Sequence, residues 1–421
     1  MGDIFFEPSL SFPIKQFLKK PAPEITSVLR GQAARKSAKS FSAKTKGGSI
    51  LNTTVRYFKQ TLRAAGIVAT LMTCVAFAAP LGLPPMPVPG DNPVTPDKVK
   101  LGDKLFHDKR FSSTGEVSCA TCHDKEKGFT DGLPVSEGIN KLRGTRNAPT
   151  VINAAYLHTQ FWDGREPTLE AQSAGPFINP VEMALPSHEP ILKIVRTDPE
   201  YVDLFKKAFA KTGNQVTMKE VEQAIASLER TLVSGNSPFD RYFYGGEKKA
   251  MSPAAIRGLE VFINQGRCVS CHVIEQTQAL FTDNRFHMIG AAAQQMPKDL
   301  DELTAAVEDV KKKGTDIAVL SNEKTSSLGR FAVTRDLTDV GAFKTPTLRN
   351  IELTAPYLHD GSLKTLEEVV QFYNNGGRVK ETDPVPELLS GGIRPLNLNK
   401  EQEADLVEFL KALTSPEFVK K

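Results

Sequence analysis

Apolar residues recur at helical spacing in several parts of the chain, each time behind a capping residue. The run 366–373 follows the i, i+3, i+4, i+7 spacing of one helix face behind a threonine–glutamate capping box. A cap followed by an apolar stripe likewise predicts helices over 217–232 and 399–413. Apolar residues at 300, 303, 307 and 310, with acidic residues between them, predict an amphipathic surface helix over 300–313. We therefore expect a mainly α fold with little strand.

Two further helix starts repeat one another. Thr95-Pro96 and Ser252-Pro253 each place a capping hydroxyl before a proline suited to the first helical position, and each leads into a Gly-x-x-apolar-Phe pattern. A second set of residues recurs at a constant offset of 197 positions. Its members are Pro149-Thr150, Asn153, Asp163-Gly164 and 168–170, matched by Pro346-Thr347, Asn350, Asp360-Gly361 and 365–367. A fixed offset indicates a duplicated unit, so we predict two related domains over residues 96–250 and 251–421.

The N-terminal part has a different pattern. An apolar run over 64–79 follows three basic residues and ends in Ala-Phe-Ala at 76–78. These features are typical of an export signal; an uncleaved membrane anchor is the alternative, although a span needs about 20 apolar residues. Residues 1–78 are thus predicted as an N-terminal extension with an export signal, which implies a periplasmic protein. The proline-rich residues 79–95 are predicted as a linker that tethers the folded body.

Charge follows the same division. The formal net charge of +4 combines +9 in residues 1–78 with −5 in the remainder. Because the basic excess belongs to the leader, nucleic-acid binding is not expected. A hydrophobic fraction of 40% with 24% charged residues is ordinary for a globular protein and excludes a disordered or multi-span class.

Two cysteine motifs indicate the chemistry. The runs 119–123 and 268–272 both read C-x-x-C-H, the attachment signature of c-type haem. One haem would be attached through its vinyl groups to the thiols of Cys119 and Cys122. A second haem would be attached in the same way to Cys268 and Cys271. His123 and His272 would then be the proximal iron ligands. A zinc knuckle or a redox dithiol is the alternative for an isolated C-x-x-C, but the histidine follows directly in both copies. We predict a dihaem protein.

The opposite face of each haem differs between the copies. A buried tyrosine such as Tyr373 is most often a core residue, yet it lies where a c-type domain needs a sixth ligand, and its oxygen can bind ferric haem. The 197-residue offset places Pro176 at the matching position, and proline cannot coordinate iron. The first haem is therefore expected to be open, with Gln172 and Glu182 close in sequence. Glu182 could move a proton on bound peroxide; a solvated loop acid is the alternative.

From about Pro96 to Ser415, the chain resembles the bacterial dihaem cytochrome c peroxidases and their MauG-like relatives. The motifs that carry this resemblance are 101–102, 119–123, 146–150, 161–165, 179–183, 268–272, 281–284 and 343–350. The resemblance implies two cytochrome c-like haem domains packed around an inter-haem tryptophan and a calcium site.

The resemblance also implies roles for individual residues. His123 would hold the peroxidatic haem, with Glu182 and Gln172 above it. Trp162, the only tryptophan, would relay electrons from the second haem. The implied calcium ligands are the Asn147 side chain and the backbone carbonyls of Thr354 and Pro356.

Two departures from the usual peroxidase pattern are visible. Ile139 occupies the position of a loop histidine that blocks the first haem in typical peroxidases, and Tyr373 replaces a methionine ligand, as in the MauG-like branch. Together the two changes fit an enzyme with a permanently open first haem and a low-potential second haem. The absence of a second tryptophan departs from MauG itself, which uses one to oxidise its protein substrate.

These observations give one leading hypothesis and two alternatives. The first is an exported peroxidase that reduces hydrogen peroxide to water with electrons from a small c-type cytochrome or copper protein. The second is a MauG-like oxidase that modifies a protein substrate through high-valent iron. The third is a dihaem electron carrier. The resemblance further implies a homodimer.

Overall fold

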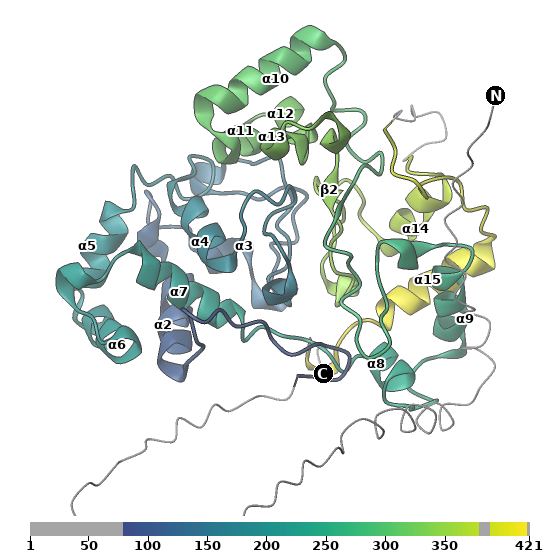
Figure 1. The fold of residues 1–421 in the computed structure, drawn as a ribbon, viewed down its shortest axis with the longest axis horizontal. Helices are drawn as coiled ribbons and strands as arrows, with labels where there is room; N and C mark the ends of the chain where they lie inside the picture. Colours follow the sequence, from purple (N-terminus) through teal and green to yellow (C-terminus); the bar gives the residue numbers. More distant parts are fainter. Residues whose placement is uncertain (1–78, 379–387, 419–421) are drawn as a thin grey trace, which may run out of the picture. The chain divides into compact units, whose positions relative to one another are not determined.

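Helices joined by long loops make up the part of the chain that the computed structural model describes, residues 79–378 and 388–418 (Figure 1). The mainly α expectation is confirmed. The predicted export signal lies outside the described residues, apart from Ala79 at its end. Among the helices that can be described, none is long and apolar enough to cross a bilayer.

The first half of the described chain builds its own hydrophobic core. Its helices are α2 (Pro96–His107), α3 (Cys119–Cys122), α4 (Leu169–Ile178), α5 (Glu189–Thr197), α6 (Pro199–Phe209) and α7 (Met218–Glu229). Thr95 caps α2 through the backbone N–H of Lys98, as its sequence predicts. α2 packs on α7 at Gly102, where an added Cβ would lie 2.1 Å from the carbonyl oxygen of Ala224. The glycine therefore permits the close crossing of the two helices.

The second half repeats this arrangement. Its helices are α8 (Pro238–Phe243), α9 (Pro253–Ile263), α14 (Leu366–Asn374) and α15 (Lys400–Lys411). α9 crosses α15 at Gly258, where an added Cβ would lie 1.9 Å from the carbonyl oxygen of Asp405. Gly102 and Gly258 thus have the same packing role in the two copies. The second core already includes Phe239 on α8, a few residues before the predicted domain boundary at 250.

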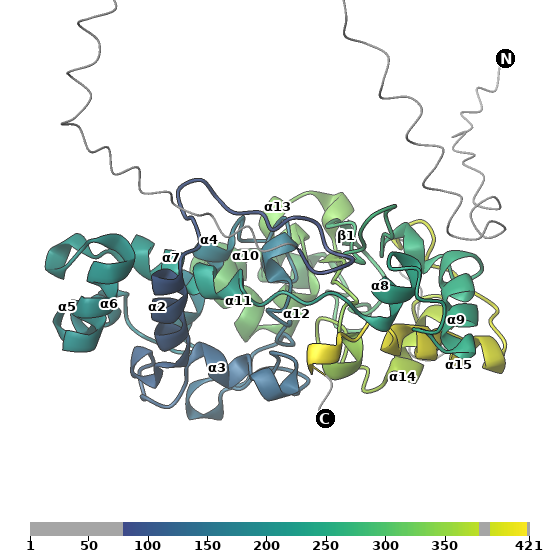
Figure 2. The same cartoon turned by 90° about the horizontal axis from the view of Figure 1, so that it is seen from below.

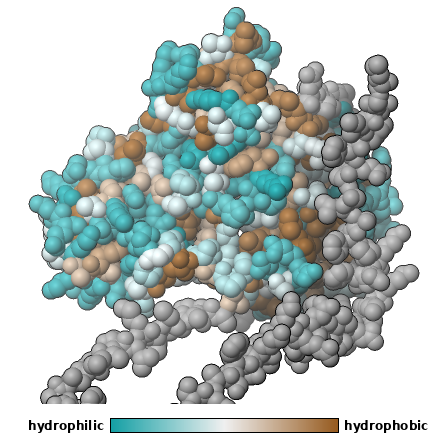
Figure 3. Space-filling view, in the orientation of Figure 1, coloured by the Kyte–Doolittle hydropathy of each residue, from teal (hydrophilic) through white to brown (hydrophobic). Residues whose placement is uncertain are grey.

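A helical insertion separates the second haem motif from α14. It contains α10 (Leu300–Lys313), α11 (Thr315–Ser321), α12 (Glu323–Ser327) and α13 (Phe331–Thr334), which enclose a small core of their own. The insertion is flanked by β1 (Phe286–His287) and β2 (Phe343–Lys344), which pair antiparallel. The predicted amphipathic helix is confirmed as α10. Its surface is not uniformly polar, because Leu300 is 74% exposed, and apolar residues are visible over the insertion at the top of Figure 3.

Residues 79–95 do not behave as a free tether in the structure. They run along the folded body from α2 toward α8 (Figures 1 and 2). The carbonyl oxygen of Gly82 accepts hydrogen bonds from Arg349 (2.7 Å) and from the backbone of Ala279 (2.9 Å). Asn92 is fully buried and donates to Glu170 (2.7 Å). The prediction of a tether rested on the high proline content of this segment, and amino-acid composition does not reveal such buried polar contacts.

Candidate functional site

The first cysteine motif forms a short capped helix. Ser118 and Thr121 make a capping box around α3, so Cys119 and Cys122 project from one turn and His123 follows as its C-cap. His123 Nδ1 lies 3.1 Å from the carbonyl oxygen of Phe129. Burial lowers the pKa of His123, which keeps the imidazole neutral. A neutral ring that donates through Nδ1 leaves Nε2 as a ligand for iron.

The second motif has the same design. The helical turn Cys268–Ser270 presents Cys268, and His272 Nδ1 lies 2.8 Å from the carbonyl oxygen of Phe281. Burial lowers the pKa of His272 as well. None of the four motif cysteines forms a disulfide, so disulfide bonding does not prevent either pair from forming two thioether bonds. The donor atoms at both motifs fit a covalently attached haem with one histidine ligand.

Glu182 lies on a tight turn beside the first motif. The side-chain oxygen of Asn179 accepts from the backbone N–H of Val181 (3.1 Å), and its carbonyl oxygen accepts from that of Glu182 (3.1 Å). Burial, and then the charge of Asp316, raise the pKa of Glu182 to about 7, although the charge of Arg165 opposes the shift. Burial and then the Glu182 carboxylate raise the pKa of the Cys122 thiol to about 12, which places this acid near the first motif.

The expected neighbours of Glu182 come from two segments. The backbone N–H of Ile139 donates to the carbonyl oxygen of Glu182 (2.9 Å), and the Ile139 side chain is buried in the first core. Pro176 lies inside α4, and its carbonyl oxygen accepts from the N–H of Met183 (3.3 Å). Gln172 lies one turn before Pro176 on the same helix, and no contact joins its side chain to Glu182 in the described part of the chain.

Trp162 lies where segments of the two halves meet. Its indole N–H donates to the carbonyl oxygen of Asn147 (2.9 Å), and its own carbonyl oxygen accepts from the N–H of Lys344 on β2 (2.8 Å). The backbone N–H of Asn147 donates to the carbonyl oxygen of His359 (2.8 Å). The side-chain amide of Asn147 also donates to the carbonyl oxygen of Leu133 (2.9 Å). Its Oδ1 would then be the atom that binds the predicted calcium ion. The calcium site with Thr354 and Pro356 stays a prediction.

Tyr373 packs at the edge of the second core, at the end of α14. Burial, and then the thiols of Cys268 and Cys271, raise the pKa of its hydroxyl, which places the ring near the second motif. Within the described ranges, this hydroxyl makes no hydrogen bond. Its role as an iron ligand stays a prediction.

Several charged residues near Glu182 were not predicted. Arg165 forms ion pairs with Asp163 (3.1 Å) and with Asp316 of the insertion (2.7 Å), and the guanidinium lies 3.5 Å from the centroid of the Phe161 ring. Asp316 is 151 positions away from Arg165 in the sequence. The signal for Arg165 was its place in the 161–165 motif, whereas no local pattern points to Asp316.

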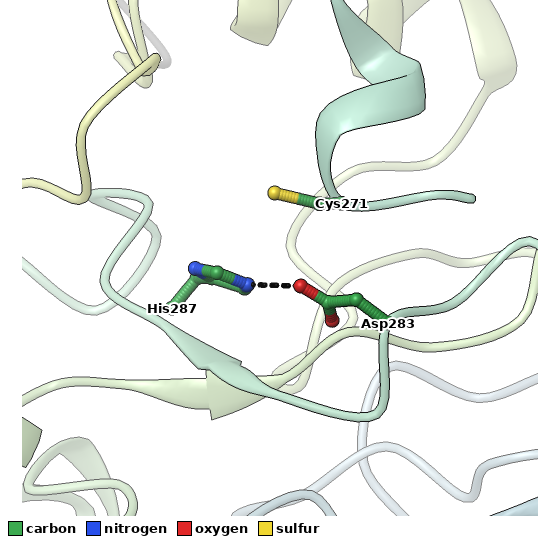
Figure 4. A group of neighbouring side chains, drawn as sticks. All are labelled: Cys271, Asp283 and His287. Atoms are coloured by element: carbon green, nitrogen blue, oxygen red, sulfur yellow. Dashed lines mark hydrogen bonds and ion pairs between the residues drawn. The ribbon is translucent and has the colours of Figure 1, made fainter. Parts of the chain in front are cut away.

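A second unpredicted group lies beside Cys271. His287 on β1 pairs with Asp283 through Nε2 and Oδ2 at 2.7 Å, and Cys271 lies close to both (Figure 4). These ligand types could hold a metal ion, but Cys271 belongs to the C-x-x-C-H motif, and its sulfur is predicted to form a haem thioether. We therefore assign the His287–Asp283 pair to the surroundings of the second haem.

The similarities of the chain agree with these two motifs. Residues 96–249 match the model of the di-haem cytochrome c peroxidase family. The chain is 36% identical over 372 residues to cytochrome-c peroxidase IdrP1 of Denitromonas iodatirespirans, covering 85% of this chain and 94% of that protein. It is 35% identical over 328 residues to the methylamine utilization protein MauG of Methylorubrum extorquens, covering 78% and 81%.

A solved structure extends the similarity to the fold. A MauG-like protein associated with microbial copper homeostasis matches with a TM-score of 0.68 and 32% identity, covering 82% of this chain and 97% of that one. Sequence identity above 30% over most of both proteins, with both haem motifs in place, establishes the relationship. The chain belongs to the di-haem cytochrome c peroxidase family, whose members include peroxidases and MauG-like oxidoreductases and whose fold implies two c-type haems.

Proposed function

We propose that this protein reduces hydrogen peroxide to water at the haem held by Cys119, Cys122 and His123. The observation that carries the proposal is the Glu182 turn beside that motif, where burial raises the pKa of the carboxyl to about 7 and the backbone N–H of Ile139 donates to the carbonyl oxygen of Glu182. The family resemblance implies that Ile139 occupies the position of a blocking histidine. Peroxidases are also among the relatives of the chain. The reaction consumes one hydrogen peroxide, two electrons and two protons and yields two waters.

The chain's own residues handle the protons. The haem, when bound, supplies the position where peroxide binds and the electrons that cleave its O–O bond. The Glu182 carboxylate accepts a proton from the peroxide oxygen nearer the haem and returns it to the farther oxygen, which leaves as water. Gln172, on the adjacent helix, orients the peroxide by hydrogen bonding.

Electrons enter at the second haem. A small c-type cytochrome or copper protein in the periplasm delivers them one at a time, and Trp162 relays them between the two halves of the chain. Two contacts of Trp162 support this route: the indole donates to Asn147 of the first half, and the backbone carbonyl accepts from Lys344 of the second half. The Asn147 side chain and the backbone carbonyls of Thr354 and Pro356 would hold a calcium ion, which would stiffen the same junction.

Mixing the diferric protein with peroxide tests the proposal. We expect a rapid change in the spectrum of the first haem without prior reduction, followed by oxidation of two reduced cytochrome c molecules per peroxide. A diferric protein that does not react contradicts the open first haem. Reaction without oxidation of a donor contradicts the peroxidase function.

A second candidate is a MauG-like oxidation of a protein substrate. The observation in its favour is Tyr373 near Cys268 and Cys271, where a tyrosine ligand would lower the potential of the second haem. MauG itself is among the relatives. Two-electron oxidation of a protein in the presence of peroxide, without consumption of reduced cytochrome c, would favour this candidate.

A further inference from the structure

The insertion of the second half contacts the turn that carries Glu182. The main contact is Asp316 on α11, whose carboxylate accepts from the side-chain amide of Asn179 at 3.0 Å. The backbone carbonyl of Asp316 lies 3.3 Å from the same amide nitrogen. Asn179 is almost fully buried, at 1% exposure, and its own oxygens accept from the N–H groups of Val181 and Glu182. Asp316 therefore fixes the residue that shapes the Glu182 turn.

Asp316 also binds Arg165, the cation whose charge lowers the pKa of Glu182. Its Oδ1 accepts from Nε of Arg165 at 2.8 Å and pairs with Nη2 at 2.7 Å. The other side of the guanidinium is paired with Asp163 and stacked on Phe161. The side chain of Arg165 is 6% exposed, so the ion pair is shielded from solvent on the arginine side. The Asp316 carboxylate thus binds both Asn179 of the Glu182 turn and the Arg165 guanidinium.

Apolar packing supports the same contact. Val181, the residue before Glu182, packs against the hydrophobic core of the insertion, beside Val319, Leu320 and Leu328. The hydroxyl of Thr145 donates to the carbonyl oxygen of Val319 (2.5 Å), which joins α11 to the first half a second time. The insertion therefore contacts the Glu182 turn at two residues, the polar Asn179 and the apolar Val181.

We propose that Asp316 is a positioning residue for Glu182: by binding Asn179 and Arg165 it holds the Glu182 turn in place from the other half of the chain. This inference rests on the proposed role of Glu182 in peroxide reduction. The groups whose charges act on Glu182 are Asp316, which raises its pKa, and Arg165, which lowers it. Loss of the Asp316 charge removes the repulsion and leaves Arg165 less compensated, so both effects lower the pKa of Glu182.

Infrared difference spectroscopy of the haem-loaded, diferric protein tests this inference without turnover. The protonated Glu182 carboxyl is assigned as the carbonyl stretch that is missing in Glu182→Gln, and its titration midpoint is measured. Asp316→Asn should lower the midpoint by about one pH unit. Asp316→Glu keeps the charge, so its midpoint should differ from that of the wild type by less than half of that shift. An unchanged midpoint in Asp316→Asn would overturn the inference.

Asp309→Asn is the matched control. Asp309 lies in the same insertion and pairs with Lys313 at 2.8 Å, but it does not contact the Glu182 turn. It should leave the midpoint unchanged; a shift as large as that of Asp316→Asn would mean that the insertion acts only through its general stability. If Asp316→Asn does not fold, Asn179→Ser breaks the same link. It should slow the reaction with peroxide at least tenfold with an unaltered second-haem spectrum, and an unaltered rate would overturn the inference.

The two proposals fail in different ways. If the wild type does not consume peroxide, the proposed function is wrong, and the infrared midpoint still shows whether Asp316 positions Glu182. If peroxide is consumed and the titration midpoint of Glu182 is the same in Asp316→Asn as in the wild type, the proposed function stands and the positioning role is wrong.

Discussion

The surroundings of Glu182 decide what this single carboxyl can do. A solvated glutamate is ionised at neutral pH and is a poor proton donor. Burial, reinforced by Asp316, raises the pKa of Glu182 to about 7. Both protonation states are then populated near neutral pH, and proton transfer in both directions needs both states.

Replacing this carboxyl tests its role directly. Glu182→Gln keeps the size of the side chain and removes the proton acceptor, so we expect peroxide turnover to fall about 100-fold. Both haems should stay attached, as measured by the haem content of the purified protein. The control is Glu189→Gln on α5, where the side chain is 77% exposed and should not influence turnover. Equal activity in Glu182→Gln and wild type would remove the acid–base role.

The pH dependence follows from the same pKa. The ionised form of Glu182 accepts the proton of peroxide, so the rate of the first peroxide reaction should rise as the pH increases through about 7. Below that pH the carboxyl is protonated and the rate should fall about tenfold per unit. Stopped-flow rates between pH 5 and 9, an interval about two units either side of that pKa, measure this limb, which should disappear in Glu182→Gln. A limb that persists in the variant belongs to another group.

Residues differ in how well sequence alone identifies them. The cysteine–histidine motifs carry their chemistry within five adjacent positions, and Glu182 belongs to a motif close to Pro176. Asp316 acts through Asn179 and Arg165, which are 137 and 151 positions away, and it lies just beyond the segment 300–313 that was predicted as a surface helix. Local patterns do not specify which distant side chains form an ion pair, so that part of the site required the structure.

At the scale of elements, the two glycines at the helix crossings are the strongest link between sequence and packing. The repeated Gly-x-x-apolar-Phe pattern predicted two equivalent helices, and α2 and α9 both confirm it. The pairing of β1 with β2 was not predicted, because each strand has two residues and carries no alternating pattern. The partners α7 and α15 were predicted as helices, but the crossing points depend on close backbone contacts that periodicity does not show.

A methyl group at either crossing should therefore be costly. In Gly102→Ala and Gly258→Ala the new Cβ would lie 2.1 Å and 1.9 Å from backbone oxygens, so the helices must separate. We expect each variant to lose about 1–3 kcal/mol of unfolding free energy, measured by denaturant titration. Gly90→Ala is the control, because no heavy atom lies within 4 Å of its added Cβ. Unaltered stability in Gly102→Ala would mean that α2 and α7 do not cross as described.

At the scale of the whole described chain, residues 79–95 join the two cores. Gly82 accepts hydrogen bonds from Arg349 and Ala279 of the second half. Asn92 donates a hydrogen bond to Glu170 of the first half. Arg349 is 2% exposed and forms a two-point ion pair with Asp240, which is fully buried. The segment is therefore hydrogen-bonded to the arginine of a buried ion pair in the second half and, through Asn92, to the first half.

Removal of this arginine should loosen the segment and weaken the fold together. Arg349→Met leaves the Asp240 carboxylate buried without its cation, a change that costs about 3–5 kcal/mol. Hydrogen exchange should accelerate at the amides of Asn236 and Ala279, which donate to the carbonyl oxygens of Leu81 and Gly82. Arg257→Met is the control, since that side chain is 51% exposed in its pair with Asp405 and should leave both amides protected. Protection that survives in Arg349→Met would show that apolar contacts, such as that of buried Leu83, hold the segment without the ion pair.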